Sequence, residues 1–329
     1  MNRTGVLLLV AMLGCAPVRS TPPSASARAP LVPPLTEPER IRQMETDLAR
    51  LTTADAESHA VAYARLSQRA RDGDRAARTV QLVFGIRDSL REGCEDEADA
   101  LAFTQQLELL SLHLAQASPG EQVFAGPTLL LALQANGRAE EQPGVAGVIV
   151  RAGRSVWADH RLALGELLAE VAHALRLGCH LRAALPLLEE AVALLQLGPE
   201  AVRSEPALLA RRDLATLRFL LGDAQSAERE LAALGADLLQ VVAGEDLQAR
   251  MEVVQVLRRY FGAADGSPPP PPRETGPGWQ ALRTVQQQAS CPEATPADPR
   301  LVRVPLPPPA CQAASGTRFS PLPPRAPRK

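Results

Sequence analysis

Four consecutive apolar stripes occupy residues 166–234, and they constrain the fold more than any other feature of the chain. Within each stripe, leucine and alanine recur at intervals of three and four residues, which is the spacing of one helix face. The stripes comprise Leu167, Leu168, Val171 and Leu175; Ala184, Leu187, Leu188, Ala191, Leu194 and Leu195; Ala210, Leu214, Leu217 and Leu221; and Ala224, Ala227, Leu231 and Leu234. Because each stripe must be buried against another element, the sequence predicts an all-α body of amphipathic helices.

Short joints separate the helices of each predicted pair. Gly222 followed by Asp223 fits a glycine just past the end of one helix and an N-cap carboxylate at the start of the next. Gly178 occupies the equivalent position in the first pair, and Ser204 with Pro206 fits the start of the third helix. Joints of this length connect antiparallel neighbours, so we expect two helical hairpins.

The two hairpins resemble each other, and both resemble the tetratricopeptide repeat (TPR). An alanine follows each joint glycine by five residues (Ala183, Ala227), and a leucine follows by nine (Leu187, Leu231). The joints are 44 residues apart, whereas the standard repeat is about 34 residues long. The resemblance implies antiparallel helical hairpins stacked as a solenoid; a plain helical bundle is the alternative.

The distribution of proline divides the chain. All but six of the 30 prolines lie in 16–38 or 265–329, so we expect one helical domain over 39–264 between proline-rich flanks. Residues 16–38 should be a tether, and 265–329 a basic disordered tail containing a polyproline run and one isolated helix, Trp279–Gln288. Within the domain, residues 118–153 hold six glycines and are expected to be the least regular part.

The N-terminal residues resemble the signal peptide of a bacterial lipoprotein. Arg3 precedes the apolar run Val6–Leu13, which is too short to span a bilayer, and Met12-Leu13-Gly14-Cys15 is similar to a lipobox. The resemblance implies that the signal peptide, residues 1–15, is cut before Cys15 and that the Cys15 sulfur carries a lipid. Ala16 in place of aspartate favours, by the same analogy, the outer membrane, facing the periplasm. The alternative is an ordinary secretory peptide with a chance cysteine.

Motifs for catalysis and for metal or cofactor binding are absent from the sequence. Lys329 is the only lysine, so no P-loop can form, and no H-E-x-x-H, C-x-x-C or G-x-S-x-G occurs. His173, Cys179 and His180 are the one cluster of metal-ligating residue types, interpreted as a partly buried cysteine beside two surface histidines. The formal net charge of −2 indicates no general attraction to nucleic acid. We therefore expect no enzyme activity, cofactor, metal or nucleic-acid partner.

Four cysteines follow Cys15, and an even number invites disulfides in an oxidising envelope. Cys291 and Cys311 enclose a short proline-rich segment, so we expect them to be bonded to each other. Cys94 and Cys179 lie near predicted helix joints. The sequence is compatible either with a disulfide between them or with two free thiols in the core.

These features favour a lipid-anchored envelope scaffold that binds an unidentified envelope protein through its helical repeats. Arg211, Arg212 and Arg218 lie opposite the apolar stripe of the helix predicted over 206–221, where they suit the carboxylates of an acidic peptide. A solvated arginine face is the alternative for them. The second hypothesis for the whole chain is an envelope enzyme or small-ligand binder with its site in residues 118–157.

Overall fold

The computed structural model describes residues 35–53, 55–196, 204–241, 245–262, 276–294 and 304–311. Within these ranges the chain forms helices and no strand, so the predicted all-α fold is confirmed. The described helices belong to one compact unit that comprises residues 36–329. The signal peptide, Cys15 and nearly all of the tether, residues 1–34, lie outside the described residues, as does the polyproline run at 268–272.

Two helical hairpins begin the body, and the local sequence explains their ends. They are α1 (Glu37–Thr53), α2 (Ala56–Arg71), α3 (Arg75–Glu92) and α4 (Glu97–Leu114). Asp55, Asp74 and Asp96 are the N-caps of α2, α3 and α4, and each carboxylate accepts hydrogen bonds from backbone N–H groups of the first turn. Gly73 joins α2 to α3 with a φ of 92°, a conformation that favours glycine.

Two further helices occupy the segment that the glycine content predicted to be irregular. They are α5 (Pro119–Ala135) and α6 (Gln142–Val156), joined by the 3-10 helix η1 (Ala139–Glu141). The prediction for 118–153 was wrong because most of these glycines lie inside helices, and Gly126 and Gly153 are sites of close packing, whereas Gly137, with a φ of 80°, is the one at a turn. A Cβ on Gly126 would lie 2.5 Å from the Ile149 side chain of α6, so glycine permits the two helices to approach closely. Ser118 and Glu121 form a capping box that begins α5.

The four helices predicted from the apolar stripes are confirmed. They are α7 (Arg161–Leu177), α8 (Leu181–Leu195), α9 (Glu205–Leu220) and α10 (Ala224–Val241). Gly222 has a φ of 97°, and the Asp223 carboxylate accepts a hydrogen bond of 3.0 Å from the Ser226 N–H. Both agree with the predicted glycine after one helix and N-cap carboxylate before the next. At the first joint it is Cys179, rather than Gly178, that takes the positive φ of 68°.

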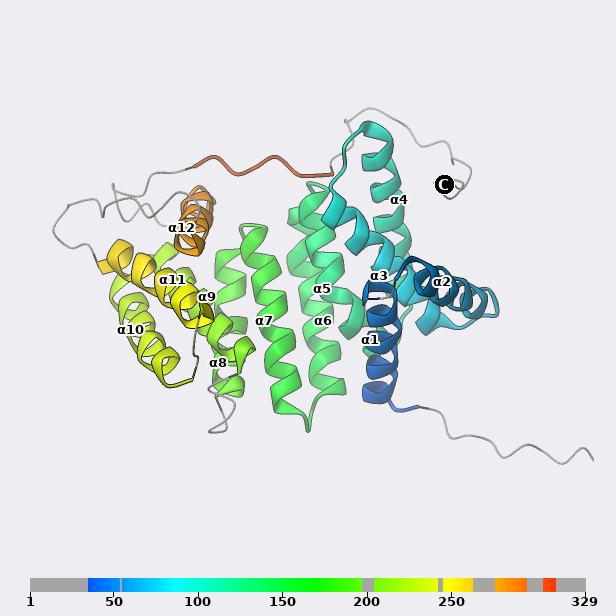
Figure 1. Ribbon diagram of the computed structural model, residues 1–329, viewed down its shortest axis with the longest axis horizontal. Helices are drawn as coiled ribbons and strands as arrows, with labels where there is room; N and C mark the ends of the chain where they lie inside the picture. The colour runs from blue at the N-terminus through cyan, green and yellow to red at the C-terminus, as the bar shows by residue number, and fades with distance from the viewer. Residues whose placement is uncertain are drawn as a thin grey trace, which may run out of the picture. The chain divides into compact units, whose positions relative to one another are not determined.

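The odd-numbered helices of the body form one layer. Helix α3 packs on α1 and α5, and α7 packs on α5 and α9, while the even-numbered helix that follows each of them packs against it as the second arm of a hairpin. Figure 1 shows α5, α6, α7 and α8 running side by side. This alternation gives the body a helical-repeat character.

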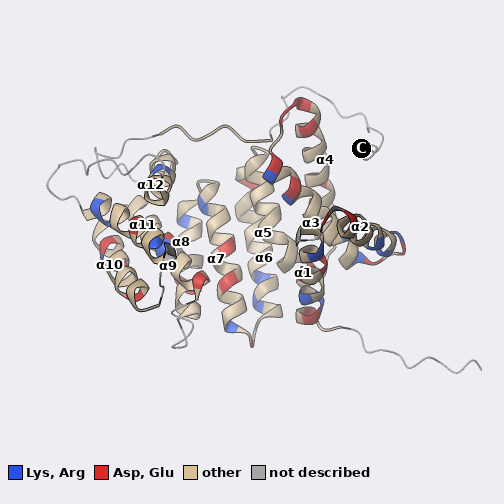
Figure 2. Cartoon of the chain, viewed as in Figure 1, with Lys and Arg blue, Asp and Glu red and all other residues tan. Residues whose placement is uncertain are grey.

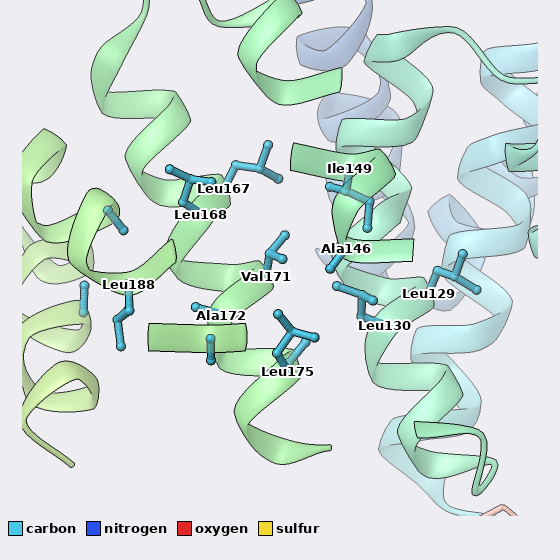
Figure 3. Packing of buried hydrophobic residues seen from close by; sticks show 14 of the residues in the cluster. Leu129, Leu130, Ala146, Ile149, Leu167, Leu168, Val171, Ala172, Leu175 and Leu188 are labelled. Atoms are coloured by element: carbon cyan, nitrogen blue, oxygen red, sulfur yellow. The ribbon is translucent and has the colours of Figure 1, made fainter. Parts of the chain in front are cut away.

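One continuous core joins these helices, and leucine and alanine dominate it. Leu130 of α5, Val171 and Leu175 of α7 and Leu188 of α8 are all buried (Figure 3). Such small and medium-sized side chains suit closely spaced helices, and they agree with the low aromatic content of 3%.

The C-terminal region is not wholly outside the helical body, contrary to the prediction of a disordered tail with one isolated helix. After α11 (Glu245–Gly262), α12 (Pro277–Gln288) packs on α11 and buries Leu282 and Val285. Residues 304–311 then run to the end of α5, where the Cys311 N–H donates a 2.8 Å hydrogen bond to the Ala135 carbonyl (Figure 1). We call residues 276–294 and 304–311 the C-terminal strap.

Two disulfides attach this strap to the body. Cys94 is bonded to Cys311, and Cys179 is bonded to Cys291, so the predicted Cys291–Cys311 pair is wrong. The prediction failed because it assumed a tail without tertiary contacts, in which the nearest thiol in sequence would be the partner. In the folded chain the partners lie 217 and 112 residues apart, at the α3–α4 and α7–α8 joints.

Removing the longer-range disulfide should destabilise the fold without abolishing the helices. For Cys94→Ser with Cys311→Ser, we expect the free energy of unfolding to fall by about 2–5 kcal/mol, because the bond closes a long loop in the unfolded chain. Denaturant titration followed by circular dichroism measures the change. Peptide mapping of the unreduced native protein should recover Cys94–Cys311 and Cys179–Cys291, and recovery of Cys291–Cys311 would contradict the structure.

Candidate functional site

A groove with charged walls runs along the layer of odd-numbered helices. Its larger part has a volume of about 620 Å³ and is lined mainly by α3, α5, α7 and α9. Its smaller part, of about 410 Å³, is lined mainly by α1, α3, α5 and α7. Arg87, Glu166 and Glu170 line both parts, so the two hollows adjoin there. We call the combined hollow the inner groove.

Three carboxylates and one guanidinium occupy the middle of the inner groove. Glu166 and Glu170 are four residues apart on α7 and therefore project from the same face. They are the acidic residues of α7, and Figure 2 colours the acidic positions of that helix red. Glu45 of α1 lines the smaller part beside them. Arg87 of α3 donates a 3.0 Å hydrogen bond to the Thr128 hydroxyl of α5, which holds its guanidinium against the groove wall.

The electrostatic environment identifies these acids as one interacting group. Burial raises the pKa of Glu170, and the negative charges of Glu166 and Glu45 add to this effect, while Arg87 opposes it. Burial, followed by Glu166, also raises the pKa of Glu45, against the influence of Arg42. Both side chains still reach solvent. The groove walls therefore exclude water from part of each carboxylate while leaving the rest open to a ligand.

A buried ion cluster fixes the α9 end of the inner groove. The Asp213 carboxylate of α9 accepts a 3.0 Å hydrogen bond from Arg176 of α7, and both side chains are less than a tenth exposed. Arg212 and His173 also contact this carboxylate, at 2.8 Å and 3.1 Å. Arg176 donates in addition to the Gln288 side chain of α12 at 2.8 Å. The cluster thus joins α7, α9 and the strap in one geometry.

The arginines proposed as a partner-binding face do not form one. Arg211 is only 4% exposed, and its guanidinium donates to Glu230 at 2.7 Å and Asp237 at 2.5 Å. The sequence prediction assumed that Arg211 and Arg218 have no acidic partner, because no acid lies four residues from either of them in the same helix. That assumption was wrong, since the partners of Arg211 lie on α10. Arg218 likewise has a partner on another helix, since it pairs at 3.1 Å with Glu189 of α8. Of the three, only Arg212 lines the inner groove.

The histidines and cysteine that resembled a metal cluster have other partners. Cys179 is in a disulfide, and His180 hydrogen-bonds the Ala139 carbonyl at 2.7 Å. His173 contacts Asp213 and Arg176. Within the described ranges, no group of three or more His, Cys, Asp or Glu residues is placed to hold a metal ion.

Trp157 and several residues of α5 are the part of the 118–157 region that reaches the inner groove. Trp157 lies just after α6, lines the smaller part of the groove, and contacts the His160 ring edge-on at 5.7 Å. His160 itself is not part of the lining. For the small-ligand alternative, the sequence suggested a pocket lined by Trp157, His160 and a carboxylate with a shifted pKa; the groove contains Trp157 with Glu45 and Glu170, without His160. The acids in the same lining come from α7, which follows Trp157 directly, and from α1, which is more than a hundred residues away.

The buried ion cluster should make stability fall in acid. Burial alone would raise the pKa of Asp213, but Arg176 and the neighbouring groups hold it well below its usual range. The stabilisation is therefore complete above the unfolded-state pKa of about 3.9 and is lost as the pH falls below it. Denaturant titrations between pH 7 and pH 3 should show this loss in the native protein and a weaker pH dependence in Asp213→Asn.

At pH 7 the same variant should lose about 3–5 kcal/mol, because it leaves Arg176 buried without its anion. Glu189→Gln is a matched control, since it removes the anion of the exposed Arg218 pair and should cost no more than about 1 kcal/mol. Equal losses in the two variants would refute the assigned role of the buried cluster.

Comparison with known proteins provides no relative from which to transfer a function. No family model matches the chain, and no curated protein or solved structure matches it significantly. Function must therefore be inferred from the inner groove, the disulfides and the N-terminal motif.

Proposed function

We propose that this chain is a lipid-anchored scaffold of the bacterial cell envelope that binds a segment of a partner protein in the inner groove. The observation that carries the proposal is the extent of the groove over the odd-numbered helices, from α1 to α9. A hollow built across consecutive helical hairpins offers an elongated surface, which suits a peptide or a helix better than a compact metabolite. The resemblance of α7–α10 to TPR hairpins supports the same type of function.

Two features support the envelope as the compartment. The disulfides Cys94–Cys311 and Cys179–Cys291 suit an oxidising environment and are uncommon in reducing cytoplasm. The lipobox-like sequence before Cys15 suits export and attachment through a lipid. No helix in the part of the chain that the structure describes is long and apolar enough to cross a membrane. Transport to the outer membrane, on its periplasmic side, remains the proposal that Ala16 favours.

The charge of the inner groove changes the proposed chemistry of the partner. The sequence suggested an acidic peptide bound by Arg211, Arg212 and Arg218, but Arg211 is buried and neutralised by acids of α10. The middle of the groove instead presents Glu45, Glu166 and Glu170 beside the single arginine Arg87. We therefore propose that the partner segment carries basic residues.

Charge reversal in the groove should remove the partner. In chemical-crosslinking pull-downs from native envelopes, Glu166→Lys with Glu170→Lys should lose the protein adducts of the native chain, because it places two cations where we propose that a cation binds. Glu57→Lys with Glu97→Lys is the control, since it makes the same charge change at exposed positions on α2 and α4. Adducts that survive the groove change, or disappear equally in the control, would refute groove binding.

The anchor generates a separate expectation. Cys15→Ser should release the protein from the membrane fraction and prevent signal-peptide cleavage, because serine lacks the sulfur that would carry the lipid. Fractionation and mass spectrometry of the mature N-terminus provide the measurement. A native protein whose mature N-terminus is any residue other than Cys15 would contradict lipid attachment at this position.

Small-ligand binding is the second candidate, and the smaller part of the groove favours it. Trp157 there faces a site that also contains Glu45 and Glu170, whose pKa values are raised. An aromatic ring beside carboxylates is a recognised arrangement for a small organic cation. A metabolite recovered with the native protein, and lost on Trp157→Ala, would support this candidate over the scaffold.

A further inference from the structure

The strap fixes one point of the C-terminal chain beside the inner groove. Cys311 is bonded to Cys94 after the end of α3, and its N–H donates to the Ala135 carbonyl at the end of α5. Its own carbonyl accepts a 3.0 Å hydrogen bond from the buried Asn136 side chain. A disulfide and two hydrogen bonds therefore fix the position of Cys311, the residue from which residues 312–329 continue.

The inner groove begins close to this point. Leu131 of α5 lines the larger part of the groove, and Ala135 follows it by four residues, on the same face and about 6 Å further along the axis. On α3, Leu90 lines the groove, and Cys94 follows it by four residues. Residues 312–329 continue from Cys311, and a chain of that length can extend up to about 60 Å. Every part of the groove is within their reach.

The charge of these following residues is opposite to that of the groove. Residues 312–329 contain Arg318, Arg325, Arg328 and Lys329 and no acid. They also contain four prolines, which favour extended backbone and suit a groove that recognises an extended peptide.

The groove acids are available for such a segment. Asp213 and Glu205 are already paired, with Arg176 and Arg250 respectively. Among the ion pairs between described residues, none involves Glu45, Glu166 or Glu170. Arg87 is the arginine that lines the groove beside them, while Arg42 also acts on Glu45 and His173 on Glu170. The middle of the groove thus keeps an excess of negative charge.

We propose that the basic segment 312–329 of this chain occupies the inner groove in the absence of a partner, with its arginines against Glu45, Glu166 and Glu170. The proposal rests on the groove being the binding site of the proposed function, and it adds an internal competitor that an external basic segment must displace. An effective concentration of about 1 mM, with an intrinsic dissociation constant of about 0.1 mM, would weaken an external ligand about tenfold.

The test uses a fluorescein-labelled synthetic peptide of residues 312–329 and fluorescence anisotropy at low salt. Three full-length oxidised proteins are compared. The first is native. The second carries Arg318→Glu, Arg325→Glu, Arg328→Glu and Lys329→Glu, which should empty the groove, and the third adds Glu166→Gln and Glu170→Gln to the second. Adding Glu57→Gln and Glu97→Gln to the second protein gives a charge-matched control on α2 and α4.

We expect the second protein to bind the peptide about tenfold more tightly than the native chain, and the third to lose about tenfold relative to the second. The control should bind as the second protein does, and a rise from 0.05 M to 0.5 M salt should weaken all binding. Equal affinities for the native and second proteins would overturn occupancy by the segment, as would binding that ignores Glu166 and Glu170. Either result, combined with loss of the envelope adducts in Glu166→Lys with Glu170→Lys, would overturn only occupancy by residues 312–329. The proposed function would then stand, with a segment of another protein as the occupant of the groove.

Discussion

Helix α5 is surrounded by protein along nearly its whole length, and the rest of the structure depends on that burial. It packs on α1, α3, α4, α6 and α7, and the carbonyl of its last residue, Ala135, accepts a hydrogen bond from Cys311 of the strap. Most of its side chains, including Leu129, Leu130 and Leu133, are buried. Removal of this much apolar surface from water contributes strongly to folding. It also fixes the position of α3 relative to α7, so the walls of the inner groove are set by contacts to α5.

The disulfides and the buried ion cluster also hold α3, α7 and α9 in position, through their contacts with the strap. Cys94–Cys311 attaches the strap beside α3, Cys179–Cys291 attaches it at the α7–α8 joint, and Arg176 links Asp213 to Gln288 of α12. The strap is thereby attached after the ends of α3 and α7, two helices that line the groove. A groove held in this way is preorganised, which reduces the entropy lost when a segment binds.

The sequence predicted the helices that are buried on one side, whereas for the helix that is buried on all sides it suggested only a short piece, Pro127–Leu133, in an irregular region. Helices α7–α10 have a polar face, so their apolar stripes show the helical period. Helix α5 has no such contrast, and its Gly120, Gly126 and Pro127 resembled the residues of a loop. A breaker signal inside a fully buried segment is therefore weak evidence for a loop, because close packing selects small residues for a different reason.

The site depended on pairs that are distant in sequence, which is why sequence patterns did not locate it. Arg211 looked unpaired because its acids, Glu230 and Asp237, lie on the next helix. Glu166 and Glu170 carry no local signal of their neighbours, because only the packing of α1, α3 and α7 on α5 brings Glu45 and Arg87 near them. The disulfide partners were hidden for the same reason, since thiols more than a hundred residues apart carry no local signal of pairing.

Site-specific photo-crosslinking in living cells tests the central claim most directly. A photoreactive amino acid at Ala169, on the groove wall of α7, is compared with one at Leu112, which is 67% exposed on α4. Binding in the inner groove predicts protein adducts from position 169 and none from position 112, with the 169 adducts lost on Glu166→Lys and Glu170→Lys. Adducts of equal yield from both positions, or from position 112 alone, would contradict the assignment of the groove as the binding surface.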